Sequence, residues 1–388
     1  MSTLEKQIEI FAETSRRYPS ELRRLKKQGK KIVCWYGSYI PVEIIHASGA
    51  LQYPLFDGGS PEPVEIALQY LQFTTNPQAR FQAGLYMMGL DPVVPIADLI
   101  IIDSKEADSV RVGNIFELHG LPVMYLGVPQ DWEKKIAYDY YKRQLNKLKE
   151  VLEKLTGEKI TNEMLLESIR KYNRIRELLS EIESFRKEHP PVIGGENFIK
   201  LNHYALRCDP DITISFLEKV VGTLKEEKKR AFSEDVKRIM VIGRGFAFGD
   251  YILLRMIEEL GGVVVANLLD EGIIHQEKVR TDGDPIENIA ERYYRVKVPA
   301  CPLTPSFRRR WEHIAWLVKE YCIDGLLYYQ LAFDVIYDHE WPIFSKRASE
   351  IGIPFIMVEV AYNFSREATE TLKSRVESFI KICRSGGK

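Results

Sequence analysis

The sequence predicts an α/β protein with two doubly wound parallel-sheet domains and a helical segment between them. Three observations support this prediction. Short apolar runs alternate with helical patterns before residue 130, strand patterns are missing from residue 131 to about 188, and the alternation restarts near residue 236. At 388 residues the chain is long enough for two domains of roughly 100–200 residues each. We therefore expect an N-terminal α/β domain over 1–130, a helical segment over 131–235 and a C-terminal α/β domain over 236–388.

The first domain is expected to begin with a helical region, because apolar residues recur at helical spacing up to about Gly29. A helix is also expected from Pro41, which suits a first helical position, to Ala47 before Gly49. Four apolar runs predict strands, and the third is apolar throughout, as in strands buried on both faces of a parallel sheet. They are Lys31–Tyr36, Leu51–Phe56, Asp98–Asp103 and Gly120–Leu126.

The central segment is expected to be helical, because Leu145, Leu148 and Leu152 begin a set of apolar residues at helical spacing. In the last third, a helix is expected over Asp250–Leu260 and a closing helix over Glu367–Cys383. Four further strands are predicted there, at Arg238–Gly243, Gly262–Leu268, Asp324–Tyr329 and Ile353–Val358.

The two α/β regions repeat one pattern. Asp98 opens a buried strand and Gly120-Leu-Pro leads into the next, while Asp324 and Gly352-Ile-Pro occupy the same places later. We interpret this as an internal duplication. In such sheets ligands bind at the carboxyl ends of the strands, so a shared cleft between the two domains is expected.

Composition excludes several classes of protein. Lys and Arg total 54 and Asp and Glu 55, so no excess of positive charge favours nucleic acid. The longest apolar runs fall far short of a membrane span, and no secretory segment is visible, so we expect a cytoplasmic protein. The five cysteines are scattered without a Cys-x-x-Cys pair, which disfavours a disulfide framework or a zinc knuckle.

Two motifs suggest phosphate binding. Gly243-Arg-Gly-Phe-Ala-Phe-Gly249 follows a strand, but its glycines are spaced one residue too far apart for a dinucleotide fingerprint, so a structural turn is favoured. Arg308, Arg309 and Arg310 form the sharpest basic cluster, which suits phosphates through bidentate hydrogen bonds or, equally, a solvated helix start. The histidines show no metal-ligand spacing, and we expect no metal site.

The segment Gly29–Gly49, with Pro41-Val-Glu43 at a helix start and Ala47-Ser-Gly49 after it, resembles one family. This family comprises the subunits of 2-hydroxyacyl-CoA dehydratases and benzoyl-CoA reductases. Arg310 before a helix, Asp324-Gly, Gly352-Ile-Pro and the closing Leu372-x-x-Arg-x-Glu-x-Phe379 match its pattern in order. The resemblance implies repeated Rossmann- or flavodoxin-like domains, a two-subunit assembly acting on CoA thioesters and an ATP-hydrolysing electron activator. It also implies a 4Fe–4S cluster held by three cysteines in the cleft.

The chain departs from the family at those cysteines. The matching positions are Asn76, Ala107 and Asp334, none of which carries sulfur, so the cluster expected of the family lacks its ligands here. The residues expected to bind substrate are Glu43, Arg80, Arg308, Arg309 and Arg310.

Three hypotheses stay open at this point. The first is a cluster-free subunit that works beside a cluster-bearing homologue, or beside a second copy of itself. The second is a cluster-free acyl-CoA-binding or regulatory paralogue without catalysis of its own. The third is an enzyme with a hard metal at Asp334 and Asp338, which are four residues apart and could share a helix face.

Overall fold

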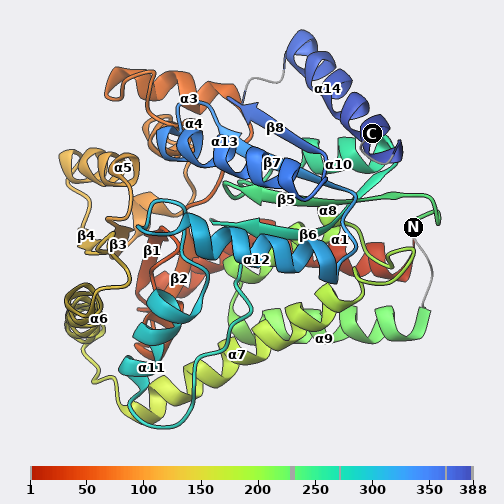
Figure 1. Cartoon of the computed structure of the whole chain (residues 1–388). Coiled ribbons are helices and arrows are strands. Elements are labelled where there is room, and N and C mark those ends of the chain that lie inside the picture. The colour runs from red at the N-terminus through yellow and green to blue at the C-terminus, as the bar shows by residue number, and fades with distance from the viewer. Residues whose placement is uncertain (1, 228–231, 271, 363–364, 386–388) are drawn as a thin grey trace.

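A computed structural model describes residues 2–227, 232–270, 272–362 and 365–385. It contains two four-stranded sheets in which every neighbouring pair of strands is parallel (Figure 1). The first sheet has the strand order β2-β1-β3-β4 and the second β6-β5-β7-β8. The strands are β1 Ile32–Tyr36, β2 Leu51–Pro54, β3 Leu99–Asp103, β4 Val123–Leu126, β5 Lys237–Gly243, β6 Gly262–Leu269, β7 Gly325–Leu331 and β8 Phe355–Val360. All eight predicted strands are present, with ends displaced by at most three residues.

The two sheets share one connectivity, which confirms the predicted pair of like α/β units. The side chain of Asp98 accepts a hydrogen bond from the backbone N–H of Ile32 at 2.9 Å. Asp324 does the same for the backbone N–H of Arg238 at 2.8 Å, so each aspartate ties the start of one strand to its neighbour. The prolines of the two Gly-x-Pro turns also correspond: the carbonyl of Pro122 accepts from Ile100 N and that of Pro354 from Leu326 N. These matched contacts explain why the same short motifs recur in both halves.

Helices surround the sheets and connect successive parallel strands, as parallel pairing requires. Their bounds are α1 Thr3–Lys27, α2 Val42–Ala47, α3 Pro61–Ile66, α4 Pro77–Met87, α5 Ala107–Leu118, α6 Lys135–Thr156, α7 Asn162–Ser184, α8 Gly195–Arg207, α9 Pro210–Glu227, α10 Ile252–Glu259, α11 Pro285–Glu291, α12 Phe307–Glu320, α13 Val335–Glu350 and α14 Arg366–Arg384. A short π-helical turn, Arg292–Val296, follows α11. Among the described residues, no helix combines the length and the apolar character needed to cross a bilayer.

Helices α6 to α9 form the region for which the sequence predicts no strands. Helix α7 packs on α2 and α9, while α8 contacts both β2 of the first sheet and β6 of the second (Figure 1). Helix α1, from the start of the chain, packs on α8 and α9. The helical region therefore touches both halves. The domain limits at residues 130 and 235 stay a prediction.

Candidate functional site

Loops from both halves meet where the parallel strands end. Lys105 and Glu106 follow β3, Arg244 follows β5, and Asp334 follows β7. All four side chains are buried, with at most 6% of any residue exposed. Carboxyl ends of parallel strands are where α/β proteins place their ligands. We call these four residues the charged cluster.

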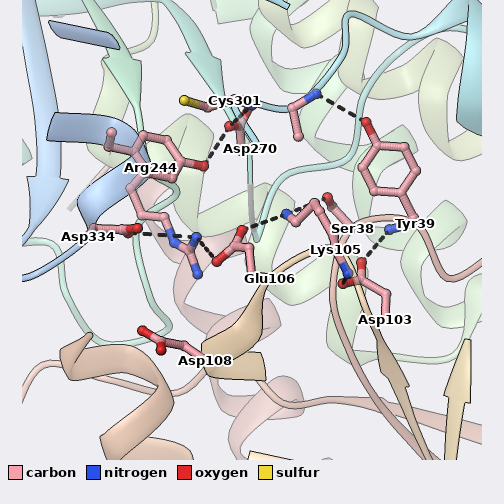
Figure 2. Close-up of polar contacts among 12 residues, drawn as sticks. Ser38, Tyr39, Asp103, Lys105, Glu106, Asp108, Arg244, Asp270, Cys301 and Asp334 are labelled. Carbon is pink, nitrogen blue, oxygen red and sulfur yellow. Dashed lines mark hydrogen bonds and ion pairs between the residues drawn. The ribbon is translucent and has the colours of Figure 1, made fainter. Parts of the chain in front are cut away.

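Arg244 lies at the centre of the charged cluster (Figure 2). Its Nη1 donates to Glu106 Oε2 at 2.7 Å and lies 3.7 Å from Asp334 Oδ2. Its Nη2 donates to Gln78 Oε1 at 3.3 Å. Since Glu106 and Asp334 belong to different halves, this one guanidinium group links the two domains electrostatically.

Lys105 extends the cluster toward the loop that follows β1. Its Nζ lies 3.0 Å from Glu106 Oε1 and 3.4 Å from Ser38 Oγ (Figure 2). The carbonyl of Ser38 accepts from Lys297 Nζ at 2.8 Å. Next to it, the backbone N–H of Tyr39 donates to Asp103 Oδ2 at 3.1 Å. Ser38 therefore lies between two buried ammonium groups.

The two carboxyl groups around Arg244 have opposite pKa shifts. Burial alone would raise both, but Arg244 and Lys105 together outweigh burial at Glu106 and lower its pKa to about 2. For Asp334, burial dominates, Arg244 only partly offsets it, and the neighbouring carboxylates of Glu106 and Asp108 oppose ionisation, so its pKa rises to about 8. Asp334 Oδ2 has no hydrogen-bond partner among the described residues. At neutral pH the cluster thus holds an ionised Glu106 and a largely protonated Asp334.

The three positions matched to the family cysteines lie around this cluster. Asn76 caps the start of α4, and its side-chain and backbone N–H groups donate to Asp108 Oδ2 at 2.8 and 2.9 Å. Asp108 is the residue after Ala107, which begins α5, and Asp334 caps the start of α13. Phe73 and Phe333 also meet across the two halves, with ring centroids 5.5 Å apart. The structure therefore brings the three loops together, while the role of these positions stays a prediction.

These residues do not fit a 4Fe–4S cluster. Such clusters are held mainly by thiolates, and an amide, a methyl group and a carboxyl do not supply them. Of the free cysteines, Cys34, Cys208 and Cys383 are buried in other parts of the fold and Cys322 is exposed. Cys301 is buried near the charged cluster (Figure 2), but a single thiol does not supply the three thiolates. Within the described ranges, no group of three His, Cys, Asp or Glu side chains is placed to hold a metal ion. Of the pair Asp334 and Asp338, Asp338 Oδ1 accepts from Gln330 Nε2 at 2.7 Å, and a metal at this pair stays a hypothesis.

The consecutive arginines proposed for phosphate binding differ in their surroundings. Arg310 is fully buried, and its three nitrogens donate to Asp270, Glu340 and the carbonyl of Pro299. It therefore stabilises the second domain from within, and its contact with substrate stays a prediction. Arg309 donates to the carbonyls of Arg295 and Val296. Arg308 is the most exposed of the three, with 87% of its side chain exposed, while Arg309 is half-buried.

The other two expected substrate residues are also enclosed. The carboxylate of Glu43 is buried, paired with Arg176 of α7, and accepts from the hydroxyl of Tyr293 at 2.9 Å. The Nε of Arg80 donates to the carbonyl of Thr75 at 3.0 Å, directly before Asn76. Glu43 thus ties α2 to α7, and Arg80 supports the loop that carries Asn76.

Sequence inspection missed Arg244, Lys105, Glu106 and Ser38. A usable signal existed for the first three, since charged residues directly after buried strands point to a carboxyl-end site. Arg244 lies inside the glycine-rich turn after β5, and the glycine spacing of that turn was interpreted without its arginine. Ser38 follows Gly37 at the end of β1 in the same way.

The fold and site define a two-domain α/β protein whose charged cluster joins the carboxyl ends of two related parallel sheets. A family model described as 2-hydroxyglutaryl-CoA dehydratase, D-component, matches residues 37–382, and the chain belongs to that family. This confirms the resemblance inferred from the sequence motifs.

Individual relatives agree with this assignment. One of the subunits of benzoyl-CoA reductase from Thauera aromatica is 25% identical, with 86% of each chain covered. The (R)-phenyllactyl-CoA dehydratase beta subunit of Clostridium sporogenes is 22% identical over 92% of this chain and 93% of its own. The beta subunit of (R)-2-hydroxyglutaryl-CoA dehydratase from Acidaminococcus fermentans is 22% identical over 91% of this chain and 93% of its own.

Proposed function

We propose that this protein is a subunit of a complex that acts on CoA thioesters, and that it carries no 4Fe–4S cluster of its own. The proposal combines family membership over residues 37–382 with the identity of three side chains. Relatives named as subunits of benzoyl-CoA reductase and of 2-hydroxyacyl-CoA dehydratases support a partner subunit and a thioester substrate.

The observation that carries the proposal is the set Asn76, Ala107 and Asp334, which lies on three converging loops without a thiol. Arg244 and Glu106 occupy the neighbouring space as an ion pair of 2.7 Å. Soft thiolate ligands are what iron–sulfur clusters require, and this environment supplies hard oxygen ligands and cations instead. The partner subunit would then hold the redox group, and an ATP-dependent activator would serve that partner.

The test is anaerobic reconstitution of the purified chain with iron and sulfide, followed by iron and sulfide quantitation and an absorption spectrum. We expect no bound cluster in the natural chain. A variant with Asn76→Cys, Ala107→Cys and Asp334→Cys is the matched control, because it restores sulfur at the same three loops. About four irons per natural chain would overturn the proposal.

A second candidate function is a cluster-free acyl-CoA-binding or regulatory paralogue. It is favoured by the internal pairing of the charged cluster, where the carboxylate of Glu106 is paired with both Lys105 and Arg244. Affinity purification from the native host separates the two candidates. A stoichiometric, cysteine-bearing homologue in the eluate supports the first proposal, and a homo-oligomer that binds acyl-CoA supports the paralogue.

A further inference from the structure

A cavity separate from the charged cluster lies where α1, the loop after β2, α8 and the turn after β5 meet. Its volume is about 240 Å³, a little below the range of drug-sized ligand sites, so it fits a small metabolite and not a nucleotide. Both halves and the helical region supply its walls, and the charged cluster lies outside this lining. The lining includes Ala12, Arg16, Asp57, Tyr204, Arg207 and Phe248.

Arg207 is the more enclosed of two cations in this lining. Its Nη2 donates to Asp57 Oδ1 at 2.6 Å, whereas its Nη1 makes no hydrogen bond within the described part of the chain. The guanidinium carbon lies 4.3 Å from the ring centroid of Phe248 and 5.3 Å from that of Tyr53. Two rings and one carboxylate therefore hold the guanidinium group in place, and one of its nitrogens stays available to a ligand.

Arg16 is the second cation, on the solvent side of the cavity. It lies 2.7 Å from Glu9, and the two side chains are 62% and 59% exposed. Exposed ion pairs contribute little to stability, so a ligand can take the place of Glu9 at small cost.

The lining carries more positive than negative charge. Burial lowers the pKa of His203 to about 3, so this ring is neutral, and its Nδ1 lies 2.8 Å from the hydroxyl of Tyr251. Among the described lining residues, Arg16 and Arg207 then face the single carboxylate of Asp57. An excess of one positive charge favours a ligand with one negative charge.

The rest of the lining suits a carboxylate with an apolar body. The hydroxyl of Tyr204 makes no hydrogen bond to any residue that the structure describes, so it can donate to an anion. Ala12 and Phe248 are buried and supply an apolar wall. Guanidinium groups bind carboxylates through paired hydrogen bonds. A phosphate dianion would exceed the excess charge and would leave the apolar wall uncovered.

We propose that this cavity binds a small monocarboxylate. The carboxylate accepts from Arg16, Arg207 and the hydroxyl of Tyr204, and the apolar body of the ligand packs on Ala12 and Phe248. This site goes beyond the proposed function and does not depend on it.

The first experiment tests the class of ligand. Calorimetry compares benzoate with benzamide, which has the same shape without the charge, and with inorganic phosphate. We expect benzoate to bind with a dissociation constant of about 1 mM or below, and at least about tenfold more tightly than either of the others. Equal binding of benzamide would remove the need for an anion, and equal binding of phosphate would remove the need for an apolar body. Either result would overturn the proposal.

Two neighbouring arginines of α1 locate the site. Arg16→Gln should weaken benzoate binding by about fivefold or more, because it removes a charged donor from the lining. Arg17→Gln is the matched control, since Arg17 is also exposed and paired with a glutamate, Glu13, but lies outside the lining. The control should keep its affinity within about twofold. Equal affinities of the two variants would contradict the proposal.

Two further substitutions should change benzoate binding in opposite directions. Asp57→Asn removes the competing carboxylate and should tighten binding by about threefold or more. Ala12→Leu fills the cavity and should weaken binding by about tenfold or more. Thermal melting checks that each variant folds, and the comparison of Arg16 with Arg17 decides alone where one does not. A folded Ala12→Leu variant with normal affinity, or a folded Asp57→Asn variant with unchanged or weaker affinity, would count against this site.

Titration of benzoate in the presence of excess CoA separates this site from the proposed function. Unchanged benzoate affinity supports a separate carboxylate site. Displacement of benzoate by CoA would overturn this site and leave the proposed function in place. Failure of CoA to bind at all would count against the proposed function and leave the carboxylate site in place.

Discussion

The two halves of the molecule present one acidic side chain each at equivalent places. Glu106 precedes α5 after β3, and Asp334 precedes α13 after β7. Despite this equivalence, the pKa of Glu106 is lowered to about 2 and that of Asp334 is raised to about 8. The same position in a repeated fold thus carries an ionised carboxylate in one half and a protonated carboxyl in the other.

The difference comes from where the cations lie. Glu106 is within 3.0 Å of Lys105 and 2.7 Å of Arg244, whereas Asp334 is 3.7 Å from Arg244 alone and feels the carboxylates of Glu106 and Asp108. Burial disfavours the ionised form of both carboxyl groups. Only at Glu106, which is paired with two cations, does the electrostatic attraction outweigh that cost. A duplicated backbone therefore does not dictate duplicated electrostatics.

The largest effect is expected from removing the cation that the two halves share. Arg244→Met should lower the free energy of unfolding by about 3–5 kcal/mol, because Glu106 would lose a buried ion-pair partner. Urea denaturation at pH 7 measures this change. Arg244→Lys keeps the charge but loses the bidentate guanidinium geometry, so its free energy of unfolding should lie between those of the natural chain and Arg244→Met. A loss below about 1 kcal/mol would show that Arg244 does not hold the halves together.

A smaller effect should separate the two acids directly. At pH 7, Glu106→Gln should destabilise the fold by about 2–3 kcal/mol, since it removes the anion between two cations. Asp334→Asn should stabilise the fold at pH 7, because the natural carboxyl is protonated when folded and ionises on unfolding. Equal losses in the two variants would contradict the opposite ionisation states.

The pH dependence of these variants follows from the direction of each shift. For Asp334 the folded pKa lies above its unfolded value, so the folded state binds the extra proton and stability falls as pH rises from about 4 to 8. Asp334→Asn should therefore gain stability over the natural chain across this window, with a slope of up to about 1.4 kcal/mol per pH unit. The stabilising contribution of Glu106 is present above its unfolded pKa and is lost as pH falls toward 2, so Glu106→Gln should match the natural chain only in acid.

The smallest effect is expected at Arg308, an exposed cation of the second half that lies outside the charged cluster. Its side chain is 87% exposed and lies 3.6 Å from Glu312 on the same helix. Arg308→Ala should change the free energy of unfolding by less than about 0.5 kcal/mol, because exposed pairs contribute little. A loss above about 1 kcal/mol would show that burial is not what distinguishes Arg244.

Much of the fold could be predicted from the sequence. Asp98-Leu-Ile-Ile-Ile predicts a strand buried on both faces, and β3 is fully buried along its length. The recurrence of Asp98 and Asp324, each followed later by a Gly-x-Pro turn, predicts two units of one topology. Both signals are local, because they depend on apolar periodicity and on turn residues only a few positions apart.

The convergence of Asn76, Ala107 and Asp334 on neighbouring loops was also predictable, but only through family resemblance and the rule that strand ends meet. The partners of those loops were not predictable. Arg244 and Glu106 are 138 residues apart in the chain, and no spacing in the sequence connects them. A charge after a buried strand indicates that a site exists without showing which opposite charge will reach it.

The three consecutive arginines show what sequence alone determines and what only tertiary structure decides. The sequence determines that Arg308, Arg309 and Arg310 begin a helix, because apolar residues at helical spacing follow them. Neighbouring residues of a helix point about 100° apart, so three identical side chains must face different surroundings. Only the packed structure decides that Arg310 turns inward to Asp270 and Glu340 while Arg308 stays in solvent. The physical reason is that burial of an arginine depends on whether distant carboxylates reach it, and those carboxylates arrive from the end of β6 and from α13 through the fold.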